Sequence, residues 1–216
     1  MRTSAKIIQL LVPMFVWAVA MPVARAADPG DAATQPTARQ VIDQVTHDVL
    51  TVLGDQHLSH DQKAQKVKQI AHDHISFEVM SRLCLGRYWR GLNDDQRTRY
   101  VEEFQQLITN TYAQMIDPDK AMDRDVKILG DREESDGDWT VRTDIIGIRG
   151  NDANHEFDKV DYRLRNLQGR WKVIDFTIDD ASLVANYRAQ FQEIMSNGGI
   201  DHLLKVLHDK NAATEK

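Results

Sequence analysis

The chain has a single cysteine, Cys84, among its 216 residues. One cysteine excludes an internal disulfide, so packing rather than crosslinking must stabilise the fold. Cys84 lies in the apolar stretch 79–85, which favours a small core residue over a nucleophile. Common catalytic motifs are absent too: G-x-S-x-G, H-E-x-x-H, C-x-x-C and a phosphate-binding glycine loop. These absences favour a binding protein over an enzyme, and we expect no cofactor and no metal.

Positive charge is in deficit, with 27 Lys and Arg residues against 33 Asp and Glu residues and a formal net charge of −6. Such a balance is poorly suited to binding nucleic acid or to lying on an anionic lipid surface. The eight histidines do not form a common zinc motif. The nearest pairs, His57 with His60 and His72 with His74, are best interpreted as solvated residues near helix ends.

The longest apolar run is short and lies at the start of the chain. A basic start precedes the apolar residues 7–20, and the small residues Ala24 and Ala26 then fit the A-x-A cleavage rule. A membrane span needs about 20 continuous apolar residues, more than this run offers. We therefore predict a signal peptide over residues 1–26, cleaved near Ala26/Ala27. No cysteine follows the cleavage site, so we expect no lipid anchor.

Beyond a small, polar leader over 27–37, apolar residues recur at three- and four-residue spacing, which predicts helices. Ser59 with Gln62 has capping-box spacing, and Asn93 also suits a helix start. The predicted helices run from Ala38 to Gly54, from Ser59, from Ser76 through Leu85, from Asn93 to Pro118, from Leu183 to Gly198, and from Ile200 to Leu207. The whole domain is predicted to span 38–208, with a polar tail over 209–216.

Between these helices the apolar period changes to two. Strands are predicted at 126–128, 139–145, 160–165 and 172–179, separated by explicit turns. In the last strand Ile174, Phe176 and Ile178 are predicted to share the apolar face. An antiparallel meander with one apolar face needs a cover. The predicted fold class is therefore α+β: a curved antiparallel sheet of four to five strands, covered by N-terminal and C-terminal helices that enclose an apolar pocket.

Two carboxylates, Asp179 and Asp180, follow the last strand. One of them could be the general base of a small-pocket isomerase or dehydratase, with Asp180 the first candidate. The simpler interpretation is that Asp180 caps the following helix. An adaptor that binds only proteins is a further alternative.

Two longer segments carry a resemblance. The first is ISFEVMSRLCLGRYWR at 75–90; the second is GRWKVIDF at 169–176, followed by DASLVANYRAQF at 180–191 and GGID at 198–201. Together they resemble the signature of the MlaC family, the toluene-tolerance periplasmic proteins. The resemblance covers roughly residues 38–208. It departs from the family pattern at Asp179-Asp180-Ala181, where many members have a carboxylate followed by glycine.

The resemblance implies a monomeric periplasmic phospholipid carrier without catalytic activity. Members of this family shuttle phospholipid between an outer-membrane lipoprotein–porin complex and an inner-membrane ABC transporter with its periplasmic lipid-binding subunit, which maintains outer-membrane lipid asymmetry. A sub-branch is associated with hopanoid synthesis, so a hopanoid cargo is an alternative.

Position by position, the resemblance implies a lipid pocket formed by apolar residues of helices and strands. These residues are Leu85, Tyr88, Phe104, Leu107, Ile108, Tyr112, Val141, Ile145, Val160, Tyr162, Leu164, Phe176, Tyr187, Phe191 and Ile194.

Overall fold

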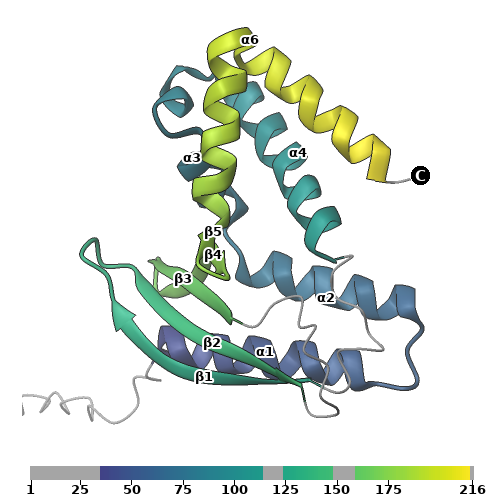
Figure 1. The fold of residues 1–216 in the computed structure, drawn as a ribbon. Helices are drawn as coiled ribbons and strands as arrows, with labels where there is room; N and C mark the ends of the chain where they lie inside the picture. The colour runs from purple at the N-terminus through teal and green to yellow at the C-terminus, as the bar shows by residue number, and fades with distance from the viewer. Residues whose placement is uncertain (1–34, 114–123, 148–158, 215–216) are drawn as a thin grey trace, which may run out of the picture. The chain divides into compact units, whose positions relative to one another are not determined.

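The computed structural model describes residues 35–113, 124–147 and 159–214 (Figure 1). Its elements are α1 (Ala38–Gly54), α2 (His60–His74), α3 (Phe77–Leu85), the 3-10 helix η1 (Gly86–Gly91), α4 (Asp94–Ala113), β1 (Arg124–Glu133), β2 (Trp139–Gly147), β3 (Lys159–Leu167), β4 (Arg170–Ile178), β5 (Ala181–Ser182) and α6 (Leu183–Thr214). Within these ranges, no helix combines the length and the apolar character that a membrane crossing requires.

The predicted helix starts are confirmed by their caps. The Ser59 hydroxyl accepts a hydrogen bond from the backbone N–H of Gln62, whose side chain bonds back to the Ser59 backbone. Asn93 and Gln96 make the same reciprocal pair at the start of α4. Each pair satisfies N–H groups that a helix start leaves without partners. The predicted end of this helix at Pro118 lies outside the described residues.

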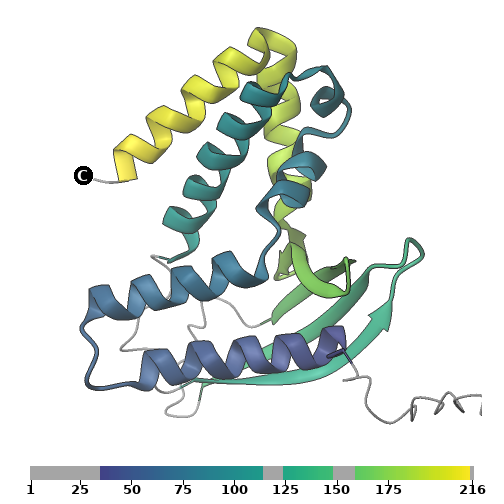
Figure 2. The same ribbon diagram turned by 180° about the vertical axis from the view of Figure 1, so that it is seen from behind.

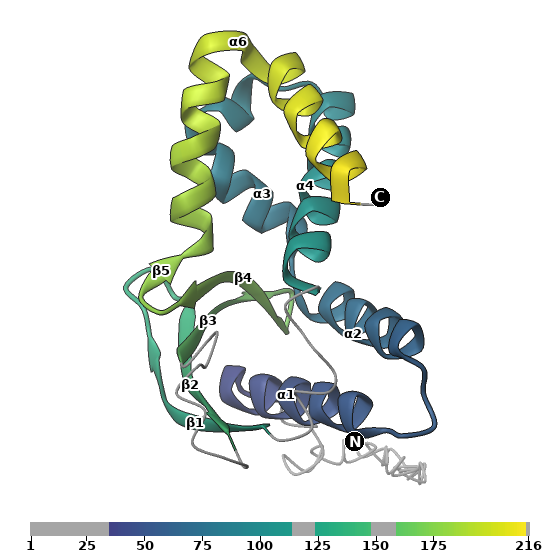
Figure 3. The same cartoon turned by 45° about the vertical axis from the view of Figure 1, so that its right-hand side comes forward.

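The sheet is a five-stranded antiparallel meander in the order β1-β2-β3-β4-β5, as the predicted α+β class requires. Helix α1 contacts β1 and β2 and lies along the strands, which is seen best from behind in Figure 2. Figure 3 shows the sheet curving around α1, with α2 beside it.

The prediction for β4 is wrong at one point. Its pairing with β3 contains a β-bulge: Arg163 pairs with Asp175, but Leu164 pairs with Val173. A bulge places an extra residue in one strand and shifts the alternation of its side chains. Val173, rather than Ile174, therefore packs with the apolar face of the sheet.

The predicted helix cap at Asp180 is also wrong. Asp179 and Asp180 have positive φ angles of 46° and 65° and form an exposed turn. The cap is Ser182, whose hydroxyl accepts from the Ala185 N–H at 3.0 Å and donates to Asp175 at 2.6 Å. Asp175 also accepts from the Val184 N–H at 2.9 Å, so a β4 carboxylate stabilises the start of α6.

The last helix bends where the sequence predicts a boundary. Gly199 has φ 66° and ψ −166°, a backbone conformation that residues other than glycine rarely adopt. Beyond it the helix continues to Thr214, so most of the segment predicted as a polar tail is helical. The buried Asn211 fixes this end to α4, donating to the backbone oxygen of Glu103 at 3.0 Å and to its carboxylate at 2.7 Å.

Buried apolar residues form two clusters. The helical core is built from α3, α4, α6 and the residue that follows η1, and comprises Phe77, Met80, Cys84, Leu85, Leu92, Tyr100, Phe104, Leu107, Ile108, Leu183, Val184, Phe191, Leu203, Leu204 and Leu207. The sheet core lies between α1 and the sheet and comprises only Ala38, Ile42, Val141, Leu164 and Val173. Half-buried Ile75 and Phe176 pack against both clusters and connect them.

Candidate functional site

The apolar face of the sheet turns toward α1. Strand register places the predicted lipid contacts of the sheet on this face, because Tyr162 of β3 is directly opposite Val141 of β2 and Phe176 of β4. Figure 3 shows this face on the inner side of the curved sheet. All six predicted sheet residues share it: Val141, Ile145, Val160, Tyr162, Leu164 and Phe176.

Helix α1 covers only part of this face. Val141 and Leu164 are fully buried, whereas Ile145, Tyr162 and Phe176 retain accessible surface. Other apolar residues packed against the sheet core are half-buried as well, namely Val41, Ile75, Ile128, Trp139 and Trp171. The inner face therefore has more apolar surface than the described helices bury.

Tyr162 shows what kind of surface this is. Removal from water raises the pKa of its hydroxyl to about 12, and a side-chain hydrogen bond with Thr143 acts in the opposite direction with smaller effect. The same residue is nevertheless only half-buried. The hydroxyl of Tyr162 is therefore removed from water, while part of the side chain remains accessible.

Five predicted lipid contacts lie in the helical core instead. Phe104 stacks on Tyr100, with ring centroids 5.9 Å apart, and meets Phe191 edge to face at 5.5 Å. These rings contact each other and are fully enclosed by protein. The predicted residues with this environment are Leu85, Phe104, Leu107, Ile108 and Phe191. In this structure these five side chains contact other residues of the helical core.

The remaining predicted helix residues are half-buried. Tyr187 packs on Phe104 at 5.3 Å between ring centroids, and burial together with neighbouring Tyr112 raises its pKa to about 12. Burial also raises the pKa of Tyr112. Ile194 packs against the helical core, and Tyr88 lies on η1 beneath the guanidinium of Arg87. Tyr112 and Tyr187 therefore share the desolvated but incompletely covered character of Tyr162.

A separate hollow of about 570 Å³ lies between α2 and α4. Its lining is largely polar and rich in carboxamides, which suits it poorly to acyl chains: Gln65, Lys68, Gln69, His72, Phe77, Glu102, Gln105, Gln106, Thr109 and Asn110.

Comparison with known proteins decides the family. The family model described as MlaC protein matches residues 43–209. This chain belongs to the MlaC family. A curated MlaC relative from Haemophilus influenzae, the intermembrane phospholipid transport system binding protein, is 25% identical over 132 residues. That match covers 61% of this chain and 60% of the relative, which is less than two thirds of the relative's length.

A solved structure is similar to this chain over a longer stretch. The phospholipid-binding protein from Ralstonia solanacearum, in complex with a phospholipid, superimposes with a TM-score of 0.71 at 27% identity. The match covers 84% of this chain and 100% of that chain. The α+β architecture described above is therefore the architecture of a phospholipid-binding neighbour.

Two further aromatic residues of this MlaC-family chain pack against the sheet core and were not among the predicted contacts. Trp139 and Trp171 meet edge to face at 6.4 Å between ring centroids and pack against the sheet core. Trp139 could have been found, because it lies two residues before Val141 in an alternating strand. Trp171 could not, because its face depends on the β4 bulge.

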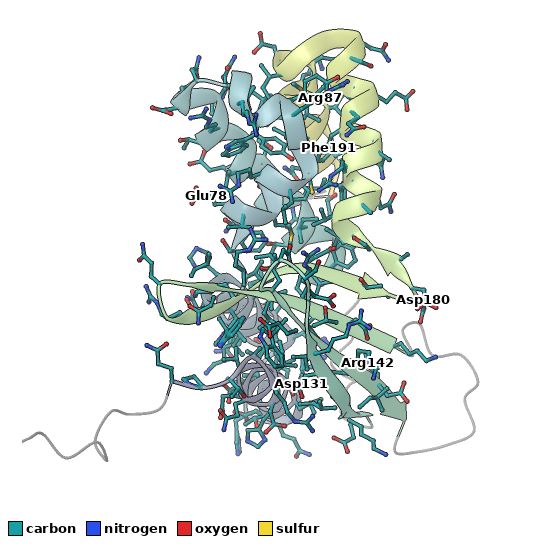
Figure 4. The ribbon with its side chains drawn as sticks, turned by 90° about the vertical axis from the view of Figure 1, so that its left-hand side faces the viewer. Glu78, Arg87, Asp131, Arg142, Asp180 and Phe191 are labelled. Carbon is teal, nitrogen blue, oxygen red and sulfur yellow. The ribbon has the colours of Figure 1, made fainter. Side chains whose placement is uncertain are left out.

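The carboxylates considered for catalysis lie in a surface turn of this MlaC-family fold. Asp179 and Asp180 are both exposed in the turn before β5 (Figure 4 labels Asp180). A general base must lie within hydrogen-bond reach of the proton that it removes from the substrate. Among the described residues, no group of three or more His, Cys, Asp or Glu side chains is arranged to hold a metal ion.

Proposed function

We propose that this chain is a periplasmic carrier that binds phospholipid and transfers it between the two membranes. In this proposal residues 1–26 are removed on export and the mature domain moves unanchored between its partners. The partners are an inner-membrane ABC transporter with its periplasmic lipid-binding subunit and an outer-membrane lipoprotein–porin complex. Transfer would maintain outer-membrane lipid asymmetry.

The observation that carries this proposal is the incompletely covered apolar face of the sheet. Ile145, Tyr162 and Phe176 lie on this face with accessible surface, and the hydroxyl of Tyr162 is desolvated. The phospholipid complex of the Ralstonia protein and the name of the Haemophilus relative support a phospholipid as the ligand.

Acyl chains give a physical reason for such a surface. Each buried methylene contributes about 0.8 kcal/mol, so two long chains exposed to water would cost many kcal/mol. An apolar surface held inside the domain removes that cost during transfer. The same surface would also accommodate a hopanoid, which is the second candidate cargo.

The test is native mass spectrometry of the mature protein purified from the periplasm of the cells that export it. We expect an adduct with the mass of a phospholipid that dissociates on collisional activation. A hopanoid mass in its place would change the cargo and keep the carrier function. An unliganded protein that also fails to take up phospholipid from vesicles would contradict the proposal.

A pair of variants tests the position of the site. Ile145→Arg places a charge on the inner face, where burial of an unpaired charge is strongly unfavourable. Leu129→Arg makes the same change in β1 at a side chain that is 48% exposed. We expect lipid occupancy to fall at least tenfold in the first variant and to stay unchanged in the second. Equal occupancy in both would place the ligand elsewhere.

A further inference from the structure

A basic and aromatic surface lies on the 3-10 helix η1, away from the sheet. We define the η1 patch as Arg87, Tyr88, Trp89 and Arg90 of η1 with Arg97 of α4. Figure 4 shows Arg87 at the end of the helical part that is remote from Arg142 and Asp131 of the sheet. No part of the proposed lipid site other than Tyr88 belongs to this patch.

Arginines and aromatic rings are arranged together in the η1 patch. The Arg87 guanidinium lies 5.0 Å from the Tyr88 ring centroid and donates to the Tyr88 hydroxyl at 3.2 Å. The Arg97 guanidinium lies 5.6 Å from the Trp89 ring centroid. Trp89 in turn packs against the buried Tyr100 at 6.5 Å, which anchors the patch on the helical core.

The charge of the patch is largely uncompensated. Arg87 and Arg90 are exposed, and neither forms an ion pair with any residue in the described ranges. Arg97 has one carboxylate partner, Asp94 at 3.0 Å. The exposed Arg82 and Arg99, which flank the patch in sequence, have no ion pair in the described ranges either. Residues 82–99 thus contain five arginines against two aspartates.

This local charge has the opposite sign to that of the whole chain, which is −6. At physiological ionic strength electrostatic interactions between exposed charges are screened beyond about 8 Å. A surface that approaches η1 therefore interacts with the arginines rather than with the net charge. Arginine beside tyrosine and tryptophan is also the combination that suits a bilayer interface, because the rings sit at the level of the headgroups.

We propose that the η1 patch docks the protein reversibly onto an anionic phospholipid bilayer, with Arg87 and Arg90 contacting lipid phosphates. The net charge of −6 opposes approach to an anionic surface, which keeps this contact weak. Docking would then be oriented, with η1 toward the bilayer. The proposal concerns a surface separate from the lipid-binding face and does not require a bound lipid.

The test is co-sedimentation of the full mature protein with phosphatidylcholine vesicles prepared with and without phosphatidylglycerol. We expect binding only to the anionic vesicles and a loss of binding as sodium chloride is added. The double substitution Arg87→Gln/Arg90→Gln should weaken binding about thirtyfold, the effect of two basic contacts of typical strength.

The matched control is Arg142→Gln/Arg170→Gln, which removes the same charge from exposed residues of the sheet. We expect its vesicle binding to equal that of the wild type. Circular dichroism and lipid occupancy by native mass spectrometry, unchanged in both double variants, separate this result from loss of fold or of cargo binding.

Two results would overturn the proposal. The first is that the wild-type protein binds equally, or not at all, to vesicles with and without phosphatidylglycerol. That result is also the one expected if the same arginines bind an acidic protein instead of a bilayer. The second is a control variant that loses as much binding as Arg87→Gln/Arg90→Gln, because attraction would then follow net charge rather than the η1 patch.

Discussion

The helical core and the sheet core differ in how completely the protein itself buries their apolar surface. In the helical core, Tyr100, Phe104 and Phe191 contact one another from α4 and α6 and are almost entirely inaccessible. In the sheet core, Tyr162 and Phe176 meet edge to face at 5.6 Å but both keep accessible surface. The first cluster is complete without a ligand, and the second gains further burial if one binds.

If the sheet face binds lipid as we propose, this difference separates stability from lipid binding within one domain. Apolar residues enclosed by protein stabilise the fold in proportion to the area that they bury. Apolar residues with accessible surface contribute less to the empty protein and are available to an apolar ligand. We therefore expect substitutions in the helical core to change stability and substitutions on the sheet face to change lipid binding.

The largest effect is predicted for Phe104→Ala. Loss of a fully buried phenyl ring leaves a cavity and should lower the free energy of unfolding by about 3–5 kcal/mol, measured by urea denaturation. Leu129→Ala is the control, since its exposed side chain should change stability by less than about 0.5 kcal/mol. If Phe104→Ala lowers the free energy of unfolding only slightly in delipidated protein, the distinction between the two cores is wrong, because the helical core would then depend on the lipid.

The next effect is that of lipid removal. A ligand present at a hundred times its dissociation constant stabilises the folded state by about 2.7 kcal/mol, so delipidation should lower stability by about this amount. Hydrogen exchange should show where: we expect amides of α1, β2 and β3 to lose protection before those of α4. Equal loss throughout the domain would contradict the distinction between the two cores.

The smallest effect concerns pH. The pKa of Tyr162 rises from 10.0 to about 12 on folding, so the folded state favours its protonated form. This contribution is complete below about pH 10 and is lost as the pH rises toward 12, by up to about 2 kcal/mol given the accessible surface. Tyr162→Phe should therefore reduce the loss of stability measured between about pH 9 and about pH 12. An unchanged slope would mean that Tyr162 is not desolvated.

Elements with local signals could be predicted from the sequence. Ser59 and Asn93 start helices because their side chains bond to N–H groups three residues away, an interaction encoded within four residues. The strands followed from alternation for the same reason. The bulge in β4 did not, because it depends on pairing with β3, and alternation within one strand cannot show it.

The candidate site could be predicted only in part. Periodicity identifies the apolar face of each helix and strand but not what that face contacts, so Phe104 and Tyr162 look alike in the sequence. Only the fold shows that Phe104 is enclosed by other rings and that Tyr162 is not. Asp180 illustrates the same limit: a carboxylate before a helix suggests a cap, yet the β5 pairing moves that role to Ser182.

The position of α6 after the sheet in the sequence has a consequence for folding order. Each strand from β2 to β5 pairs with the strand before it in the sequence, so these contacts can form as soon as each hairpin has been synthesised. The contacts of α6 are different. Arg188 donates a hydrogen bond to the backbone oxygen of Leu83, 105 residues earlier, and Phe191 packs against Tyr100, which is also distant in sequence. Until α6 has been synthesised, the apolar side chains of α3 and α4 that pack against it are not covered by that helix. The part of the domain that encloses the larger set of apolar side chains is thus the part that a nascent or truncated chain leaves exposed to aggregation.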